Sequence, residues 1–161
     1  MDVPTLQTKN LELVPKTREE TRAFIDAMPA EYRKEVSPEW LARLDASAHI
    51  DPWVHGFAIR HRASGAVIGT AGFTGPPDKH GEVEIAYGVD TEHQGKGYAT
   101  EAAQALVRFA YGQEGVRLVR AHTLPEASAS TRVLTKCGFH KAGEIVDPND
   151  GVVWRWLRPR A

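Results

Sequence analysis

The chain has 161 residues, a length typical of one domain with a sizeable core. Its formal net charge is −1 and 25% of its residues are charged, so the composition gives no sign of electrostatic binding to nucleic acid or to an anionic membrane. No apolar run approaches the roughly 20 residues that span a bilayer, and the N-terminal stretch lacks the apolar core of a signal peptide. We therefore expect a single domain over residues 1–161, with no nucleic-acid and no membrane partner. Its one cysteine cannot form an internal disulfide, which fits a cytoplasmic location.

The first half of the sequence predicts a strand, two helices and a hairpin. Their expected ranges are 11–14 for the strand, 17 to about 27 and 37 to about 48 for the helices, and 54–62 and 66–73 for the hairpin strands. Thr17 and Glu20 have the spacing of a capping box, and Ser37 precedes a proline at the first helical position. Ser64-Gly65 supplies the hairpin turn.

The second half alternates strands and helices. The expected ranges are 82–89 for a strand, 100–111 for a helix, 118–123 for a strand, 126–136 for a helix, and 140–146 and 152–157 for a closing hairpin around 148–151. Apolar and β-branched residues alternate in the strands, whereas the helices repeat apolar residues every three or four positions. Hairpins followed by strands that helices separate predict a mixed α/β (α+β) fold with a twisted, mostly antiparallel sheet.

The glycine-rich segment between the strand 82–89 and the helix 100–111 is the most informative part of the chain. It reads Gln94-Gly95-Lys96-Gly97-Tyr98-Ala99. A strand, a glycine turn and a helix in this order form an anion site, because the unpaired N–H groups of the first helical turn point at the ligand. The spacing fits neither a nucleoside-triphosphate loop nor a dinucleotide fingerprint. It therefore predicts a site for another phosphorylated cofactor, the alternative being a surface turn that caps the helix.

Three motifs resemble the GNAT superfamily of N-acetyltransferases. The Gln-x-x-Gly-x-Ala pattern that starts at Gln94 resembles its pyrophosphate loop. Thr8-x-x-Leu-x-Leu resembles the opening strand of the branch that includes acetyltransferases of ribosomal-protein N-termini, and Ser130-x-x-Val-Leu-x-Lys-x-Gly-Phe resembles the helix and turn of that branch. The resemblance covers nearly the whole chain. It implies a single GNAT-like domain with about seven strands and about four helices, and acetyl-CoA as the acyl donor.

The resemblance also implies a set of cofactor-binding residues. They are Val89, Gln94, Gly95, Lys96, Gly97, Tyr98, Ala99, Thr100 and Ser128. The pyrophosphate is expected on backbone N–H groups of the glycine turn, and the pantetheine arm beside the strand that ends at Val89, where Gly88 marks an expected β-bulge. Ala127 departs from the family, whose members often carry asparagine there. Either Ser128 or backbone and water contacts substitute for it, or cofactor affinity is weakened.

Catalytic candidates lie on the strand 82–89 and at the start of the helix 126–136. Glu84, half buried among apolar neighbours, is the preferred general base, with Glu82 on the same strand face as the alternative. A backbone N–H near Tyr87 is the expected oxyanion donor. By resemblance, Ser130 is the acid that protonates the departing thiolate; the side chain of Tyr87 either shares this role or packs in the core.

The acceptor site is expected where the resemblance says least. Trp53, His55 and Phe73 are candidates to line it, although each also suits the core. Cys137 lacks a histidine partner in the sequence and is expected to be structural rather than a nucleophile. The histidine spacing matches no metal-ligand motif, so we expect no metal.

The sequence thus predicts an N-acetyltransferase that uses acetyl-CoA as a substrate and acetylates a primary amine directly in a ternary complex. A small amine or amino acid is the preferred acceptor; a protein N-terminus is the alternative. A sensor domain that binds acyl-CoA without turnover, and a longer acyl group, also remain open. Trp154 and Trp156 share one strand face, which suits either a homodimer contact or the core.

Overall fold

The computed structural model describes residues 3–34, 36–148 and 151–160. Eight strands form one sheet in the order β1-β2-β3-β4-β5-β6-β8-β7, and only the neighbours β5 and β6 run parallel. The strands are β1 (Leu6–Gln7), β2 (Leu11–Pro15), β3 (Phe57–His61), β4 (Val67–Phe73), β5 (Glu82–Val89), β6 (Leu118–Thr123), β7 (His140–Asp147) and β8 (Gly151–Arg158). The sheet is therefore mixed and mostly antiparallel, as the sequence predicts.

Five α-helices and one short 3₁₀ turn connect the strands in the described part of the chain. They are α1 (Arg18–Asp26), α2 (Ala30–Arg33), α3 (Pro38–Ala46), η1 (Thr91–His93), α4 (Tyr98–Tyr111) and α5 (Ala129–Lys136). The capping box expected at Thr17 and Glu20 is present, and Ser37 caps α3 through the N–H of Trp40. No helix among the described residues has the length and apolar character needed to cross a membrane.

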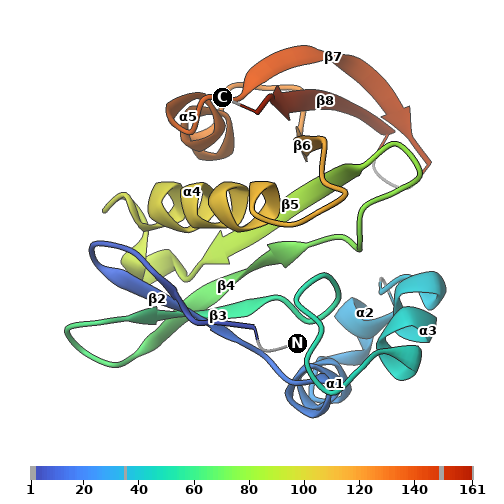
Figure 1. Ribbon diagram of the computed structural model, residues 1–161, viewed down its shortest axis with the longest axis vertical. Helices are drawn as coiled ribbons and strands as arrows, with labels where there is room; N and C mark the ends of the chain where they lie inside the picture. Colours follow the sequence, from blue (N-terminus) through green and yellow to red (C-terminus); the bar gives the residue numbers. More distant parts are fainter. Residues whose placement is uncertain (1–2, 35, 149–150, 161) are drawn as a thin grey trace.

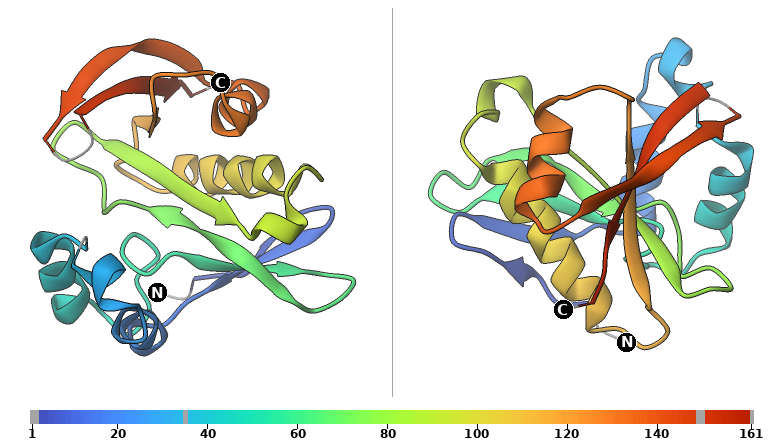
Figure 2. Two further views of the ribbon diagram at one scale, coloured as in Figure 1. Left: turned by 180° about the vertical axis from the view of Figure 1, so that it is seen from behind. Right: turned by 90° about the horizontal axis from the view of Figure 1, so that it is seen from above.

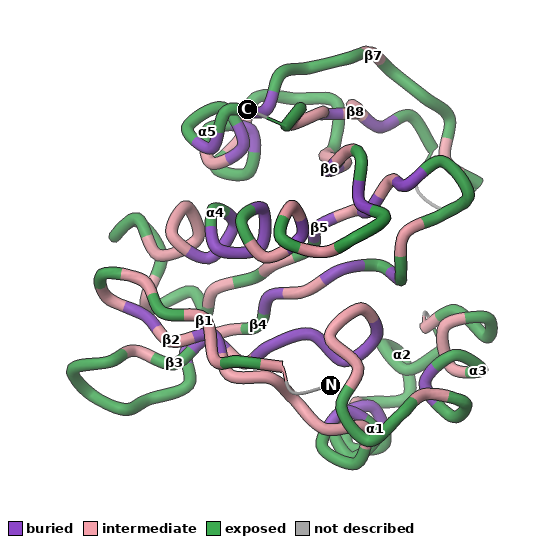
Figure 3. The backbone as a smooth tube through the Cα atoms, viewed as in Figure 1, coloured by how far each residue is buried: buried purple, intermediate pink, exposed green. Residues whose placement is uncertain are grey.

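Helix α4 covers one face of the sheet, and α1, α2 and α3 gather on the opposite side of it (Figure 1). Seen from above, α4 and α5 lie side by side (Figure 2). The buried face of α4 packs against apolar strand residues, which include Leu13, Phe57 and Ile85. Most buried residues lie on α4 and the central strands, whereas the residues of α1 to α3 are mostly exposed (Figure 3). The core therefore lies between α4 and the sheet.

Element boundaries differ from the sequence expectations at a few turns. The strand expected from Val54 begins only at Phe57, because the N–H groups of Val54 and His55 both donate to the carbonyl of Asp51 and form a turn. The helix expected from position 126 begins at Ala129, after its N-cap. The sequence did not predict β1 or the four-residue α2, both too short to show a period. Positions 149 and 150 of the last hairpin turn lie outside the described residues.

The β-bulge expected at Gly88 is wrong. Strands β4 and β5 pair without interruption from Gly69↔Val89 to Phe73↔Ile85. The separation of β5 from the next strand, which the bulge was expected to produce, is nevertheless present, because the parallel ladder of β5 and β6 ends at the pair Glu84↔Arg120. Beyond that pair, β5 continues to Val89 without a ladder partner on the β6 side among the described strands.

Candidate functional site

A groove of about 410 Å³ lies where β5, the glycine turn, α4 and α5 meet. Its lining residues are Tyr87, Gly88, Val89, His93, Gln94, Gly95, Gly97, Tyr98, Ala99, Thr100, Ala129, Ser130, Arg132, Val133 and Lys136. We call it the donor groove. Most of the expected cofactor-binding residues line it; Lys96 and Ser128 are the two that do not.

The glycine turn presents backbone to this groove. Gly95 and Gly97 have φ angles of +79° and +83°, a region that side chains disfavour, and a Cβ added at either would meet nothing within 4 Å. Gly97 is the N-cap of α4, so the N–H groups of the first turn, from Tyr98 onward, lack partners within the helix. The Gln94 amide donates to the carbonyl of Val89 over 2.8 Å and fixes the turn to the end of β5. This arrangement suits a bound anion.

Two cations in the groove were not predicted from the sequence. Arg132 and Lys136 lie four residues apart on α5, so both face the same side of that helix, and both line the groove. Their four-residue spacing was the only hint in the sequence that they act together, and the same spacing is common on the solvent-exposed face of a helix. Ser128 caps α5 instead: its hydroxyl accepts from the N–H of Thr131 over 3.3 Å. The groove therefore combines helix N–H groups with two positively charged side chains.

A second cavity, of about 340 Å³, lies beside the donor groove. Its lining residues are Lys16, Val54, His55, Gly56, Thr70, Ala71, Gly72, Phe73, Ala86, Tyr87 and Gly88. We call it the acceptor-side cavity. Phe57, Ala71 and Ile85 face α4, so the alternation along β5 turns Ala86 and Gly88 toward the opposite face of the sheet. The two cavities share Tyr87 and Gly88, where β5 has separated from β6.

The separation of these strands leaves backbone groups of β5 available at the junction. The N–H of Thr74 donates to the carbonyl of Glu84, and that of Asp90 donates to the carbonyl of Ile68. In an antiparallel pair the direction of these bonds alternates, so the N–H groups of Tyr87 and Val89 point toward the β6 side. They lie beyond the last β5–β6 pair and suit hydrogen bonding to a ligand oxygen.

The expected base, Glu84, belongs to a charged cluster on the face that the acceptor-side cavity occupies. Its Oε1 accepts from Nδ1 of His122 over 2.9 Å and lies 3.5 Å from Nε of Arg120. Glu82 accepts from Arg120 over 2.9 Å and from Arg155 over 2.8 Å. Glu84 lies two residues before Ala86, on the same strand face, but lines neither cavity itself.

His122 is a functional candidate that the sequence reasoning missed. A carboxylate only accepts hydrogen bonds, so the contact with Glu84 places a proton on Nδ1 of His122 and makes Nε2 an acceptor in the neutral ring. Nε2 is buried and has no hydrogen-bond partner among the described residues. The sequence did offer one signal for this role: Arg120 and His122 are two residues apart, so they lie on the same face of β6.

Ser130 and Tyr87 both line the donor groove. Ser130 is exposed, and its hydroxyl forms no hydrogen bond with any other residue that the structure describes. Burial raises the pKa of Tyr87 well above its ordinary value, and the nearby thiol of Cys137 adds to the shift. Of these two groups, the hydroxyl of Ser130 is exposed, whereas that of Tyr87 is largely buried and stays protonated.

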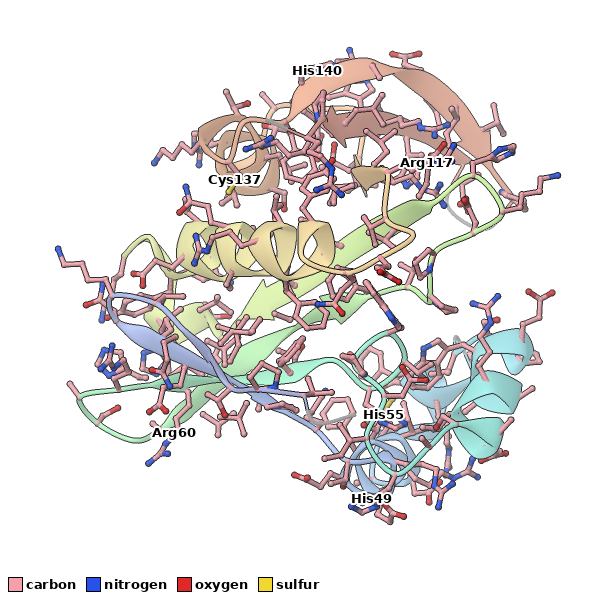
Figure 4. All side chains as sticks on the ribbon, in the orientation of Figure 1. His49, His55, Arg60, Arg117, Cys137 and His140 are labelled. Carbon is pink, nitrogen blue, oxygen red and sulfur yellow. The ribbon has the colours of Figure 1, made fainter. Side chains whose placement is uncertain are left out.

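Cys137 lies at the end of α5, facing α4 (Figure 4). It is buried, and its thiol donates to the carbonyl of Thr100 over 3.6 Å. Burial raises the pKa of this thiol to about 11, so the neutral form prevails near pH 7. These features favour the structural reading of Cys137.

The three expected acceptor residues lie in different environments. Phe73 and His55 line the acceptor-side cavity, whereas Trp53 packs on Phe73 with ring centroids 4.7 Å apart and lines neither cavity. His55 is buried beside α1 and α3 (Figure 4): Nδ1 accepts from the N–H of Asp51 over 2.9 Å, and Nε2 lies 2.8 Å from the hydroxyl of Ser47. Burial lowers the pKa of His55. A neutral ring with both nitrogens engaged indicates a structural role.

Two further sequence expectations concern metals and the tryptophans of β8. Among residues 3–34, 36–148 and 151–160, no group of three or more His, Cys, Asp and Glu side chains is placed to hold a metal ion. Trp154 and Trp156 do share a face, with ring centroids 6.5 Å apart. Trp156 is buried and donates to the hydroxyl of Thr123 over 3.0 Å, so it belongs to the core.

Comparisons with known proteins agree with this geometry. The family model described as "Acetyltransferase (GNAT) domain" matches residues 4–140. The uncharacterized N-acetyltransferase YjdG of Bacillus subtilis is 32% identical over 124 residues, which cover 75% of this chain and 68% of YjdG.

Solved structures share the fold at low sequence identity. The ribosomal L7/L12 N-acetyltransferase RimL, solved with coenzyme A, gives a TM-score of 0.70 at 16% identity and covers 97% of this chain and 98% of its own. AAC(6')-Ib, solved with ribostamycin and coenzyme A, gives a TM-score of 0.64 at 18% identity and covers 94% of each chain. With the family match over residues 4–140, these findings establish that the chain is an acetyltransferase of the GNAT family.

Proposed function

We propose that this chain transfers an acetyl group from acetyl-CoA to a primary amine by direct attack within a ternary complex, and that the acceptor is a small amine or amino acid. The observation that carries the proposal is the junction at Tyr87 and Gly88, where the donor groove meets the acceptor-side cavity. A donor and an acceptor held in the two spaces would react there without a covalent enzyme intermediate. The buried thiol of Cys137 supports the same reading.

The donor groove is suited to coenzyme A. The first-turn N–H groups of α4 and the open glycine turn would hold the pyrophosphate, with Arg132 and Lys136 close enough to the groove to neutralise phosphate charge. Both RimL and AAC(6')-Ib have been solved with coenzyme A. When bound, acetyl-CoA supplies the thioester that the acceptor attacks.

The acid–base roles are assigned to groups at and near the junction. Glu84 and His122 line neither cavity, so an ordered water would relay the proton of the acceptor ammonium to this pair. Glu84 orients the imidazole, and its Nε2 has no hydrogen-bond partner among the described residues. The amine nitrogen then bonds to the carbonyl carbon while the carbon–sulfur bond breaks. The N–H of Tyr87 hydrogen-bonds the carbonyl oxygen. The hydroxyl of Ser130 donates a proton to the departing thiolate and recovers one from the former amine nitrogen, which loses its second proton as the amide forms. Glu82, held by two arginines, positions this cluster.

A thiol-release assay with acetyl-CoA tests the proposal. The acceptor panel should contain amino acids, polyamines, aminoglycosides and short peptides with varied N-termini, since RimL and AAC(6')-Ib are among the related folds. Glu84→Gln is expected to lower kcat about 100-fold with the best acceptor, and Ser130→Ala about tenfold. Glu31→Gln, an exposed glutamate on α2, is the matched control and is expected to leave kcat unchanged.

Each other outcome points to a stated alternative. A strong preference for peptides would favour protein N-terminal acetylation over small-amine acetylation. Full turnover in Glu84→Gln would move the base to Glu82 or to an ordered water. Tight acetyl-CoA binding with no release to any amine would contradict catalysis and favour the sensor reading. Faster turnover with succinyl-CoA or propionyl-CoA would contradict acetyl as the preferred group.

A further inference from the structure

One side chain of the acceptor-side cavity has no part in the proposed chemistry. Lys16 is the only charged side chain among the described residues that line this cavity, since His55 is buried and both its nitrogens are engaged. The Lys16 ammonium forms no hydrogen bond or ion pair with any other residue that the structure describes. The ring of Phe24 lies 6.0 Å from Nζ, at the limit of a cation–π contact.

A partly buried cation without a partner is costly, and buried charges in proteins are normally paired. Burial lowers the pKa of Lys16, although Glu20 acts in the opposite direction. The carboxylate of Glu20 is already engaged, because it accepts from the N–H of Thr17 in the capping box of α1. Glu20 thus acts on Lys16 without forming an ion pair with it among the described residues, and the side chain of Lys16 lines the cavity.

The position of Lys16 is set by the register of the sheet. Its N–H donates to the carbonyl of Gly56 over 3.0 Å. Gly56 approaches Gly72 so closely that a Cβ added to Gly56 would lie 3.2 Å from the Cα of Gly72. Gly72 in turn pairs with Ala86. Lys16 directly follows β2 and Gly56 directly precedes β3, and with Gly72 of β4 and Ala86 of β5 they form one row across the sheet. All four residues line the acceptor-side cavity, and we call this row the trench, with the lysine at one end.

The two ends of the trench have different chemistry. Ala86 lies beside Gly88, at the junction with the donor groove, whereas Lys16 lies on the far side of the two glycines. Neighbouring strands are about 4.8 Å apart, so β2 and β5 are separated by about 14 Å. The lysine side chain spans part of that distance. What remains fits a short molecule that extends from the junction to the ammonium.

We infer that the acceptor is an amine that carries a carboxylate at its other end, which Lys16 binds while the amine lies at Gly88. This inference rests on the proposed function and names its substrate class: an amino acid or a similarly short amino-carboxylate, rather than a polyamine or an aminoglycoside. A charge-assisted contact with the ammonium selects the carboxylate. Because the two ends of the trench are well separated, we expect the amine and the carboxylate of the acceptor to lie farther apart than they do in an α-amino acid.

Wild-type protein tests the inference with a series of acceptors in the thiol-release assay. The series runs from glycine through β-alanine, 4-aminobutanoate and 5-aminopentanoate to 6-aminohexanoate. Each acid is paired with its own carboxamide, which has the same length and no charge. We expect each of the longer acids to exceed its amide in kcat/KM by roughly tenfold or more, mainly through KM. Equal or better turnover of the amides would overturn the inference.

Variants at Lys16 locate the effect. Lys16→Met should abolish the preference for acid over amide without changing the KM for acetyl-CoA, and Lys16→Arg should retain the preference. Lys9→Met, an exposed lysine that lines neither cavity, is the control and should behave like the wild type. A preference that survives Lys16→Met would overturn the inference while the proposed function stands. Absence of turnover with every amine would instead contradict the proposed function.

Discussion

The donor groove and the acceptor-side cavity meet at the same two residues but are built differently. Most of the donor groove comes from one continuous segment, from Tyr87 to Thr100, and α5 supplies the rest. The acceptor-side cavity takes its walls from separate segments around Lys16, Val54 and Thr70. The groove presents mainly backbone N–H groups at a helix terminus, whereas the cavity presents one cation and the rings of Phe73 and Tyr87.

This difference separates two kinds of recognition. A site made of backbone N–H groups depends on the path of the chain and tolerates change in most side chains. A site made of side chains from distant segments can change its ligand through single substitutions. We therefore expect substitutions that change the path of the backbone to decide how well the donor binds. Side-chain substitutions such as those at Lys16 should decide which acceptor is used.

The largest effect is expected from Gly97→Val. The residue has φ +83°, which a β-branched side chain adopts only with strain, so the turn must change its path and withdraw its N–H groups. We expect the Kd for acetyl-CoA, measured by isothermal titration calorimetry, to rise about 100-fold, as loss of two charge-assisted hydrogen bonds would give.

Gly115→Val is the matched control for this substitution. Gly115 has φ +86°, equally open surroundings and no place in either cavity. We expect both variants to lose similar thermal stability and only Gly97→Val to lose donor affinity. Similar donor affinity in the two variants would show that the backbone of the glycine turn does not bind the cofactor.

The next effect, at most as large, is expected from closing the junction. A Cβ added at Gly88 would meet nothing within 4 Å, and its φ is not positive, so larger residues fit there without backbone strain. Gly88→Ala and Gly88→Val should lower kcat/KM in that order, by up to roughly 100-fold, because the acceptor is displaced from the donor. Steady-state kinetics and thermal melts measure both effects. Full activity in Gly88→Val, with an unchanged melting temperature, would contradict transfer at this junction.

The smallest effect concerns the support of α4. Glu101 accepts from the hydroxyl of Thr8 over 2.7 Å, and from the N–H and the amide of Asn10 over 2.9 and 2.7 Å. Burial acts to raise the pKa of Glu101, but hydrogen bonds from Asn10 and Thr8 outweigh it and lower the pKa. Glu101→Ala should cost about 1 kcal/mol for a partly exposed site and lower Tm by about 2–4 °C at pH 7.

The pH dependence of this loss has a definite sign. Since the folded pKa of Glu101 is below its unfolded value, its contribution is present above the unfolded pKa of about 4.3 and fades as pH falls through the folded pKa. The Tm difference between wild type and Glu101→Ala should therefore shrink below about pH 4. The exposed Glu114→Gln should show no such difference. A constant difference down to pH 3 would contradict the role of the ionised carboxylate.

Local sequence could predict the donor groove because its parts are consecutive. The bounds of β5 match the prediction, Glu82 to Val89, and the turn and helix that follow are encoded by Gly95, Gly97 and a clear apolar period. The helix start at Thr17 was readable for the same reason, since a capping box spans only four residues. These features are set by residues that are consecutive in the chain, so they can be predicted from one sequence.

The acceptor side could not be predicted in the same way. The row from Lys16 to Ala86 exists only once four strands have paired in register, and no local pattern reports that register. The contact of His122 with Glu84 likewise requires the parallel pairing of β5 and β6. The expected bulge at Gly88 was wrong because β4 and β5 pair without a register shift, and the strands β5 and β6 separate without it. Both are again properties of distant segments.

The most direct test is a crystal structure of the chain with coenzyme A. The account predicts the pyrophosphate on the N–H groups of the first turn of α4, after Gly97. It also predicts the thiol at the junction of the two cavities, facing Gly88 and Ser130. A thiol that points away from the acceptor-side cavity, or a pyrophosphate held elsewhere, would contradict the central claim that the two cavities form one reaction site.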